Sequence, residues 1–269
     1  MQIQRTKLCS LDVVQLYRGN SVMKRKTMLI FLFIALGLSA VVVYGVSSFG
    51  KTKIDPTREY EVTSYITQDM LDNMQDCSVD LCLEEAYTPE SLGEDADDIV
   101  IASVISLDDG DPETGLFGVT TGKLLINQTL QGDLQQGQVV EYIKNGGVMN
   151  MAEWEDTQPV NANLKRAYLR QQAGVDIDLD NTYINIVISD DIEIEEGYTY
   201  LIYLKKNNDK YEIIGLDMGL RKLNVNYANR LSVQNYSIDT LQVMNNKTGE
   251  FESLQNYINT YINNSEEVE

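Results

Sequence analysis

Carboxylates are the side chains of this sequence with the most scope for chemistry. The chain of 269 residues holds 41 Asp and Glu against 21 Lys and Arg, and it has no His. Without His, the Ser-His-Asp, Cys-His and zinc-hydrolase chemistries are excluded. Two carboxylates can still hydrolyse a glycan when one is kept protonated and the other ionised. Glu153 and Glu155 flank Trp154, the single tryptophan, and indole rings stack on sugars, but an ordinary apolar anchor is the favoured interpretation of Trp154.

Two acidic clusters could supply hard oxygen ligands to Ca²⁺. They are Asp109, Asp111 and Glu113, and Asp176, Asp178 and Asp180. The second cluster does not fit an EF-hand, because Asn181 and Val187 stand where that loop needs Gly and Glu. A solvated turn or the wet face of a strand is the favoured interpretation of each cluster, and the sequence predicts no metal or other cofactor.

Cys77 and Cys82 are the two cysteines after residue 50. Two thiols outside the cytosol more often pair than stay reduced, so we predict a local disulfide. A zinc site is the rival interpretation, but two Cys without His leave zinc short of ligands.

A membrane segment precedes these residues. The 19 residues 28–46 carry no charge, and at about 1.5 Å of rise each they span roughly 28 Å, close to the thickness of a bilayer core. Because Lys24, Arg25 and Lys26 come just before, the N-terminus is expected in the cytosol and the chain after Lys51 outside. A secretory signal, cleaved after Ser48, is the alternative.

The sequence predicts four parts: a cytosolic N-terminus (1–27), the membrane segment (28–46), a tether and preamble (47–97) and an extracytoplasmic β-rich domain (98–269). Residues 1–22 precede a Met-Lys-Arg-Lys opening typical of exported proteins, so we expect translation to begin at Met23. The alternative is a real cytosolic extension. The pI near 4.3 argues against nucleic acid as a partner.

Strands dominate the pattern of the exported part. They are expected over 99–105, 116–130 and 139–143, over 184–188 and 192–195 by alternation, and in a hairpin of 198–204 with 211–214 after a turn at Gly197. One inserted helix is expected, capped by Thr157 with Pro159 in its first turn and ended by Gly174; Leu164, Tyr168 and Leu169 can share one of its faces. A C-terminal helix is expected to pack on the sheet as a lid, with the face Phe251, Leu254, Tyr257, Ile258, Tyr261 and Ile262.

These elements predict a mainly β (α+β) fold, in which one antiparallel domain closes as a small, OB-like barrel or packs as a sandwich. The strings DADDIVIASVISLD (95–108), TTGKLLINQTLQGDLQQGQVVEYIKNGG (120–147), DDIEIEEGYTYLIYL (190–204) and YEIIGLDMGLRKL (211–223) resemble a group of membrane-anchored extracytoplasmic β-domain proteins of Firmicutes, clostridia in particular. The resemblance covers residues 90–250. It implies a membrane- or wall-proximal β-domain and implies no activity.

The expected function is therefore a binding or structural module at the cell envelope. Its partners would be the membrane, through residues 28–46, and an envelope polymer or protein. A carboxylate-based envelope glycan hydrolase and a Ca²⁺-dependent adhesion module are the alternatives.

Overall fold

Strands make up most of the regular structure in the described residues, which are 55–79, 88–110, 118–174, 176–188 and 191–263 of a computed structural model. In chain order the strands are β1 (Tyr60–Glu61), β2 (Thr63–Ser64), β3 (Met74–Val79), β4 (Asp98–Asp108), β5 (Val119–Gln131), β6 (Val139–Asn145), β7 (Gly147–Asn150), β8 (Tyr183–Ile188), β9 (Thr199–Asn207), β10 (Lys210–Ile213), β11 (Leu220–Lys222), β12 (Arg230–Leu231), β13 (Gln242–Asn245) and β14 (Glu250–Ser253). The helices are α2 (Gln68–Asp72), α3 (Pro89–Asp95), α4 (Met151–Thr157), α5 (Val160–Ala173), α6 (Leu216–Gly219) and α7 (Leu254–Tyr261), with 3-10 turns η2 (Leu179–Asn181) and η3 (Ile238–Thr240).

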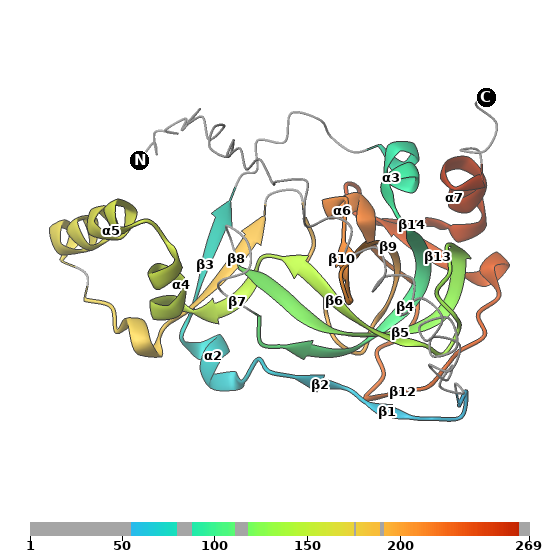
Figure 1. The fold of residues 1–269 in the computed structure, drawn as a ribbon, viewed down its shortest axis with the longest axis horizontal. Helices are drawn as coiled ribbons and strands as arrows, with labels where there is room; N and C mark the ends of the chain where they lie inside the picture. Colours follow the sequence, from blue (N-terminus) through green and yellow to red (C-terminus); the bar gives the residue numbers. More distant parts are fainter. Residues whose placement is uncertain (1–54, 80–87, 111–117, 175, 189–190, 264–269) are drawn as a thin grey trace, which may run out of the picture. The chain divides into compact units, whose positions relative to one another are not determined.

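Five strands close into a barrel (Figure 1). The order around it is β4, β5, β6, β10 and β9, and β9 pairs back onto β4. A barrel is therefore the form that the predicted mainly β domain takes. Within the domain expected to be antiparallel, residues 98–269, β10 differs from the expectation because it runs parallel to β6. β2 and β3, in the segment expected as a tether, run parallel to β4 and β8. Parallel strands are joined by long crossover connections, so the short spacing of strands along the sequence, which predicts hairpins, cannot predict parallel pairs.

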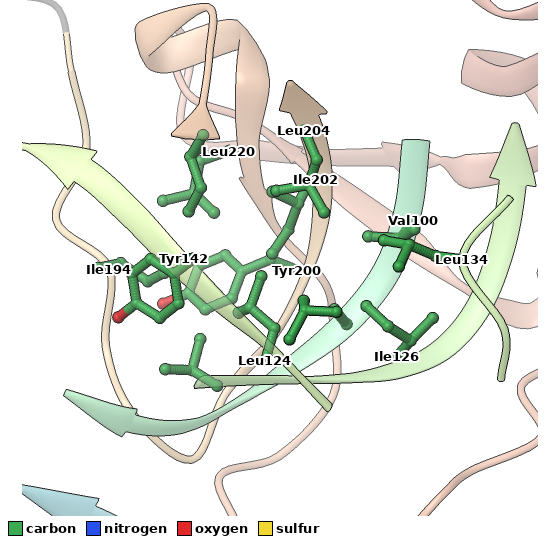
Figure 2. Close-up of a cluster of buried hydrophobic side chains, with 14 of the residues drawn as sticks. Val100, Leu124, Ile126, Leu134, Tyr142, Ile194, Tyr200, Ile202, Leu204 and Leu220 are labelled. Carbon is green, nitrogen blue, oxygen red and sulfur yellow. The ribbon is translucent and has the colours of Figure 1, made fainter. Parts of the chain in front are cut away.

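β4 is buried on both faces, which explains why its sequence is an almost continuous apolar run. Its even-numbered side chains Val100, Ala102 and Val104 point into the barrel, where they meet residues of β5, β6 and β9 (Figure 2). Ile99 and Ile101 point outward into a second apolar cluster. Burial of each such branched side chain contributes about 1.5–3 kcal/mol, so β4 draws stability from two cores.

The outer cluster lies beneath the C-terminal helix. α7 begins at Leu254, with the Ser253 side chain capping it, and buries Leu254, Tyr257 and Ile258 against β4 and β9 residues. The expected lid on the sheet is thus present. Phe251 was expected on this helix, but it lies in β14 and is exposed, because the helix starts only after that strand ends.

Residues 192–195 do not form the expected strand. Ile192 and Ile194 pack against the barrel core while Glu193 and Glu195 bond to Asn185 and Lys222, so the alternation reflects burial alone. Both edges of β4 are already occupied by β5 and β9, which leaves this segment no strand edge to join there.

Asp98 and the turn after β5, which lie in two of the strings quoted above, form one structural unit. Asp98, the first residue of β4, is buried, and its Oδ1 accepts the backbone N–H groups of Asp133 and Leu134 at 2.8 and 2.9 Å. These bonds fix the turn after β5 to the start of β4. A carboxylate that satisfies two backbone donors is among the stronger hydrogen-bonding arrangements in proteins.

The turn at Gly197 has the positive φ that its sequence position predicts, +78°. A Cβ added there would lie 2.3 Å from the Tyr227 ring. We expect Gly197→Val to lower the free energy of unfolding by at least about 2 kcal/mol, through strain and collision together. The control is Gly249→Val, at φ +71° with open space around it, which carries the strain alone. Chemical denaturation measures both, and equal losses would contradict the collision.

Candidate functional site

A second, three-stranded sheet stands beside the barrel, and a recess with both polar and apolar lining lies between the two. Its order is β3, β8 and β7. The chain passes from β6 of the barrel to β7 through Gly146 and Gly147, both at positive φ. A Cβ at Gly147 would come within 2.0 Å of the Thr120 hydroxyl, so glycine is required for this close approach. The corner after β6 therefore positions the second sheet.

The recess between the barrel and this sheet is a cavity of about 140 Å³, which we name the Lys144 cavity. Its lining comes from the end of β6, from β7 and β8, and from the segments 65–74 and 191–194. The polar side chains in this lining include Tyr65, Thr120, Lys144, Asn185, Asp191 and Glu193. A volume near 150 Å³ accommodates a group of about the size of benzene.

A buried ion pair forms part of the cavity wall. The Lys144 Nζ contacts Asp191 Oδ2, and the two side chains are only 9% and 6% exposed. Asp191 Oδ1 also accepts the backbone N–H of Ile192 at 2.8 Å. Removing two charges from water costs several kcal/mol per ion, which a well-bonded pair only partly offsets. Such a pair at a cavity is a feature that stability alone does not require.

Amide and carboxylate groups line the cavity beside this pair. Asn185 is buried in β8, and its Nδ2 donates to Glu193 Oε1 at 2.8 Å and to Asp76 Oδ1 at 3.3 Å. Across the cavity the Tyr65 hydroxyl donates to the Val148 carbonyl at 2.5 Å, and burial raises the pKa of Tyr65 far above its ordinary value, so it stays a neutral donor. The site thus combines apolar walls with fixed hydrogen-bonding groups.

Glu155, one of the two carboxylates considered for glycan hydrolysis, has a partner in another helix. Glu155 is buried at the junction of α4 and α5, where Arg170 binds it with two hydrogen bonds of 2.6 and 3.1 Å. These bonds, with the charges of Arg170 and Arg166, lower the pKa of Glu155. A general acid for glycan hydrolysis needs a raised pKa, and Glu153 on the same helix is exposed. The two residues therefore do not form a catalytic pair.

Trp154 is the apolar anchor that its sequence position favoured. It packs on Met149, Ile184 and Ile186 of the second sheet, and the Arg166 guanidinium lies 4.7 Å from the ring centroid. The helix boundary expected nearby is different: Thr157 ends α4 instead of capping the next helix, and Pro159 is the residue before α5. The single expected helix is thus preceded by a separate short helix, α4, which begins after its cap at Asn150.

The other predicted site residues are only partly described. Asp111, Glu113 and Cys82 lie outside the described residues, so the first calcium cluster and the Cys77 disulfide stay predictions. Cys77 lies half-buried in β3. Within the described ranges, no group of three acidic or Cys side chains is arranged to hold a metal ion, and this includes the cluster that begins at Asp176.

The residues of the Lys144 cavity were not singled out by the sequence. One signal was present: Val140, Tyr142 and Lys144 alternate on the same, buried face of β6. A lysine that continues an apolar face predicts a buried partner. The partner Asp191 lies in an irregular segment, so no period identifies it.

Comparison with family models, with curated proteins and with solved structures finds no match to this chain. Among the helices of the described residues, none has the length and apolar character needed to cross a bilayer, and the expected segment 28–46 lies outside those residues.

Lys144→Met leaves Asp191 as an unpaired buried charge. We expect a loss of about 3–5 kcal/mol in the free energy of unfolding, and recovery of most of it when Asp191→Leu is added. The exposed pair of Lys210 and Glu141 gives the control, since Lys210→Met should cost less than about 1 kcal/mol. Urea denaturation of the unmodified chain and the three variants measures these differences; a loss that the second substitution fails to reverse would rule out the ion pair as its cause.

The lowered pKa of Glu155 predicts an acid-sensitive contact. Its stabilising effect is fully present above the ordinary pKa of 4.5 and is lost as the pH falls through the lowered value. Because Trp154 packs under Arg166, its fluorescence should shift to longer wavelength in that interval while the far-ultraviolet circular dichroism persists. Glu155→Gln should abolish the transition. A transition that survives this substitution would assign it to another group.

Proposed function

We propose that the protein is a membrane-anchored extracytoplasmic binding module whose ligand site is the Lys144 cavity. The observation that carries the proposal is the ion pair of Lys144 and Asp191, buried in the wall of a cavity between two sheets that a purely structural domain would fill with apolar side chains. Preformed recesses with apolar walls and a few fixed polar groups are the usual form of a ligand site.

The strand order supports the location of this site. Numbered from β4, the barrel reads first, second, third, fifth and fourth strand, closing on the first, which is the order of an OB barrel. OB barrels bind ligands on the face of their second and third strands and on the adjoining loops. Thr120 of β5 and Lys144 of β6 are on those strands here, and both line the cavity.

The chemistry of the cavity favours a peptide ligand with an apolar residue beside a basic one. The volume suits one large side chain. Near its polar groups lie the carboxylates of Asp76 and Glu193, which both accept hydrogen bonds from the Asn185 amide. A cationic group of the ligand would meet complementary charge there.

Anchoring follows from the sequence. The uncharged segment 28–46 with basic residues before it supports retention in a membrane, and the resemblance to extracytoplasmic β-domain proteins of Firmicutes supports the same orientation. On this proposal the β-rich domain faces the envelope. Protease added to intact protoplasts should then degrade the chain after Lys51 while cytosolic proteins survive; survival of the domain would contradict the orientation.

Peptide binding tests the cavity directly. Acetyl-Lys-Leu-Lys-amide, added to the full chain in nanodiscs, should change the fluorescence of Trp154 saturably, because Trp154 packs on Ile186 of the cavity wall. Acetyl-Glu-Leu-Glu-amide should bind more weakly. Glu193→Gln should weaken binding of the basic peptide by about 1.5–5-fold, the scale of one exposed charge pair.

The matched control is Glu212→Gln, on β10 and outside the cavity lining. It should leave the affinity for the basic peptide unchanged. Equal affinity for the two peptides, or equal effects of the two glutamate substitutions, would contradict the proposed site.

A further inference from the structure

Helix α5 packs with its polar side inward. Asn163, Arg166 and Arg170 face α4, where they contact the Glu155 carboxylate and backbone and the Trp154 ring. The apolar residues of the helix face outward: Val160, Leu164, Tyr168 and Leu169 are 74%, 67%, 59% and 54% exposed. Leu164, Tyr168 and Leu169, which were expected to share a face, are thus all exposed, and the domain does not cover them.

Helix α7 shows the usual arrangement of an amphipathic helix. α7 buries its apolar face in the core, and in Figure 1 it lies at the other end of the domain from α5. α5 is held by charge instead, through the Glu155 pair with Arg170. Holding a helix by its polar side leaves its apolar side available, and exposed apolar stripes of this kind mark interaction sites.

Charge separates α5 from the rest of the domain. Lys165, Arg166 and Arg170 lie on it and no acid does, in a chain with a net charge of −20. Each other helix of the described residues is acidic or uncharged. Arg166 and Arg170 are turned toward Glu155, so the base on the exposed, apolar side of α5 is Lys165. Such a surface suits the interface of an anionic membrane, where apolar side chains enter and a basic group meets headgroups.

The length of chain before the domain keeps it at such a surface. Eight residues, 47–54, and hence nine Cα-to-Cα steps, separate Val46, the end of the expected membrane segment, from Asp55, the first described residue. At no more than about 3.6 Å per residue they reach roughly 30 Å. The effective concentration of α5 at the bilayer is then high, so a weak contact suffices.

From these observations we propose that α5 lies on the outer surface of the membrane, with Val160, Leu164, Tyr168 and Leu169 among the lipid acyl chains and Lys165 at anionic phospholipid headgroups. The inference rests on the proposed anchor. A second copy of the chain fits less well, because four such side chains present on the order of a few hundred Å², below the roughly 800 Å² per partner of a standard protein interface.

Lipid contact can be measured with one indole on this face. In a Trp154→Phe background, Leu164→Trp places the only tryptophan on the outer side of α5, and Phe251→Trp, in β14, places it on an exposed control site. The full chain of each variant is reconstituted in vesicles of phosphatidylcholine and phosphatidylglycerol with brominated acyl chains, which quench an indole that touches them. We expect a blue shift and strong quenching for Leu164→Trp and neither for Phe251→Trp. Quenching should fall when Lys165→Glu is added or when phosphatidylglycerol is omitted.

Three outcomes would overturn the proposal, and they are distinguishable. An inserted chain with equal, weak quenching at both positions places α5 in water and leaves the anchor intact. A blue shift at position 164 without quenching shows that protein covers the helix. A chain that alkaline carbonate extracts from the vesicles contradicts the anchor itself, and the α5 proposal fails with it. Matching melting temperatures of the two tryptophan variants confirm that both are folded.

Discussion

The pairing of β4 on both of its edges is the constraint on which the rest of the structure depends. Its ladder with β5 and its ladder with β9 close the barrel, so both faces of the strand become core. The buried Asn127 side chain reinforces the closure: it donates to Ser103, which bonds Thr199 at 2.8 Å, and it accepts the backbone N–H of Gln234. One polar network thus joins β4, β5, β9 and the segment that follows β12.

Basic residues are outnumbered by acidic ones in this chain, and several of them form ion pairs while largely buried. Lys144, Arg170 and Arg221 each meet a carboxylate with little exposure of their own, and Arg221 also lies 4.7 Å from the Tyr257 ring centroid under α7. A chain with this excess of acid repels itself, and each internal base offsets part of that repulsion. The same pairs fix the second sheet, α5 and the lid, so charge decides the position of elements that the barrel alone leaves unspecified.

Elements whose burial follows a regular period could be predicted from the sequence, and elements set by distant partners could not. β4 follows a continuous apolar run bounded by turn residues, β6 follows alternation and α7 follows helical spacing, and with the β9–β10 hairpin they lie where these patterns predict. The parallel pairing of β6 with β10 joins strands some 70 residues apart, and nothing local records it. The outward face of α5 depends on Glu155, which lies on another helix. For the same reason Lys144 carries a local signal while Asp191 carries none.

Closure of the barrel also determines the order in which strands can pair while the chain is being synthesised. β4 pairs with β5 soon after both exist, but its other partner, β9, lies about 100 residues later, as the register of Asp98 with Leu204 shows. A chain made from its N-terminus must therefore hold an apolar strand with one open edge until β9 arrives, and such edges recruit other chains. Contacts of this long range also slow folding. The period between completion of β5 and arrival of β9 is when this protein is most exposed to aggregation, and a factor that covers the free edge of β4 would act in that interval.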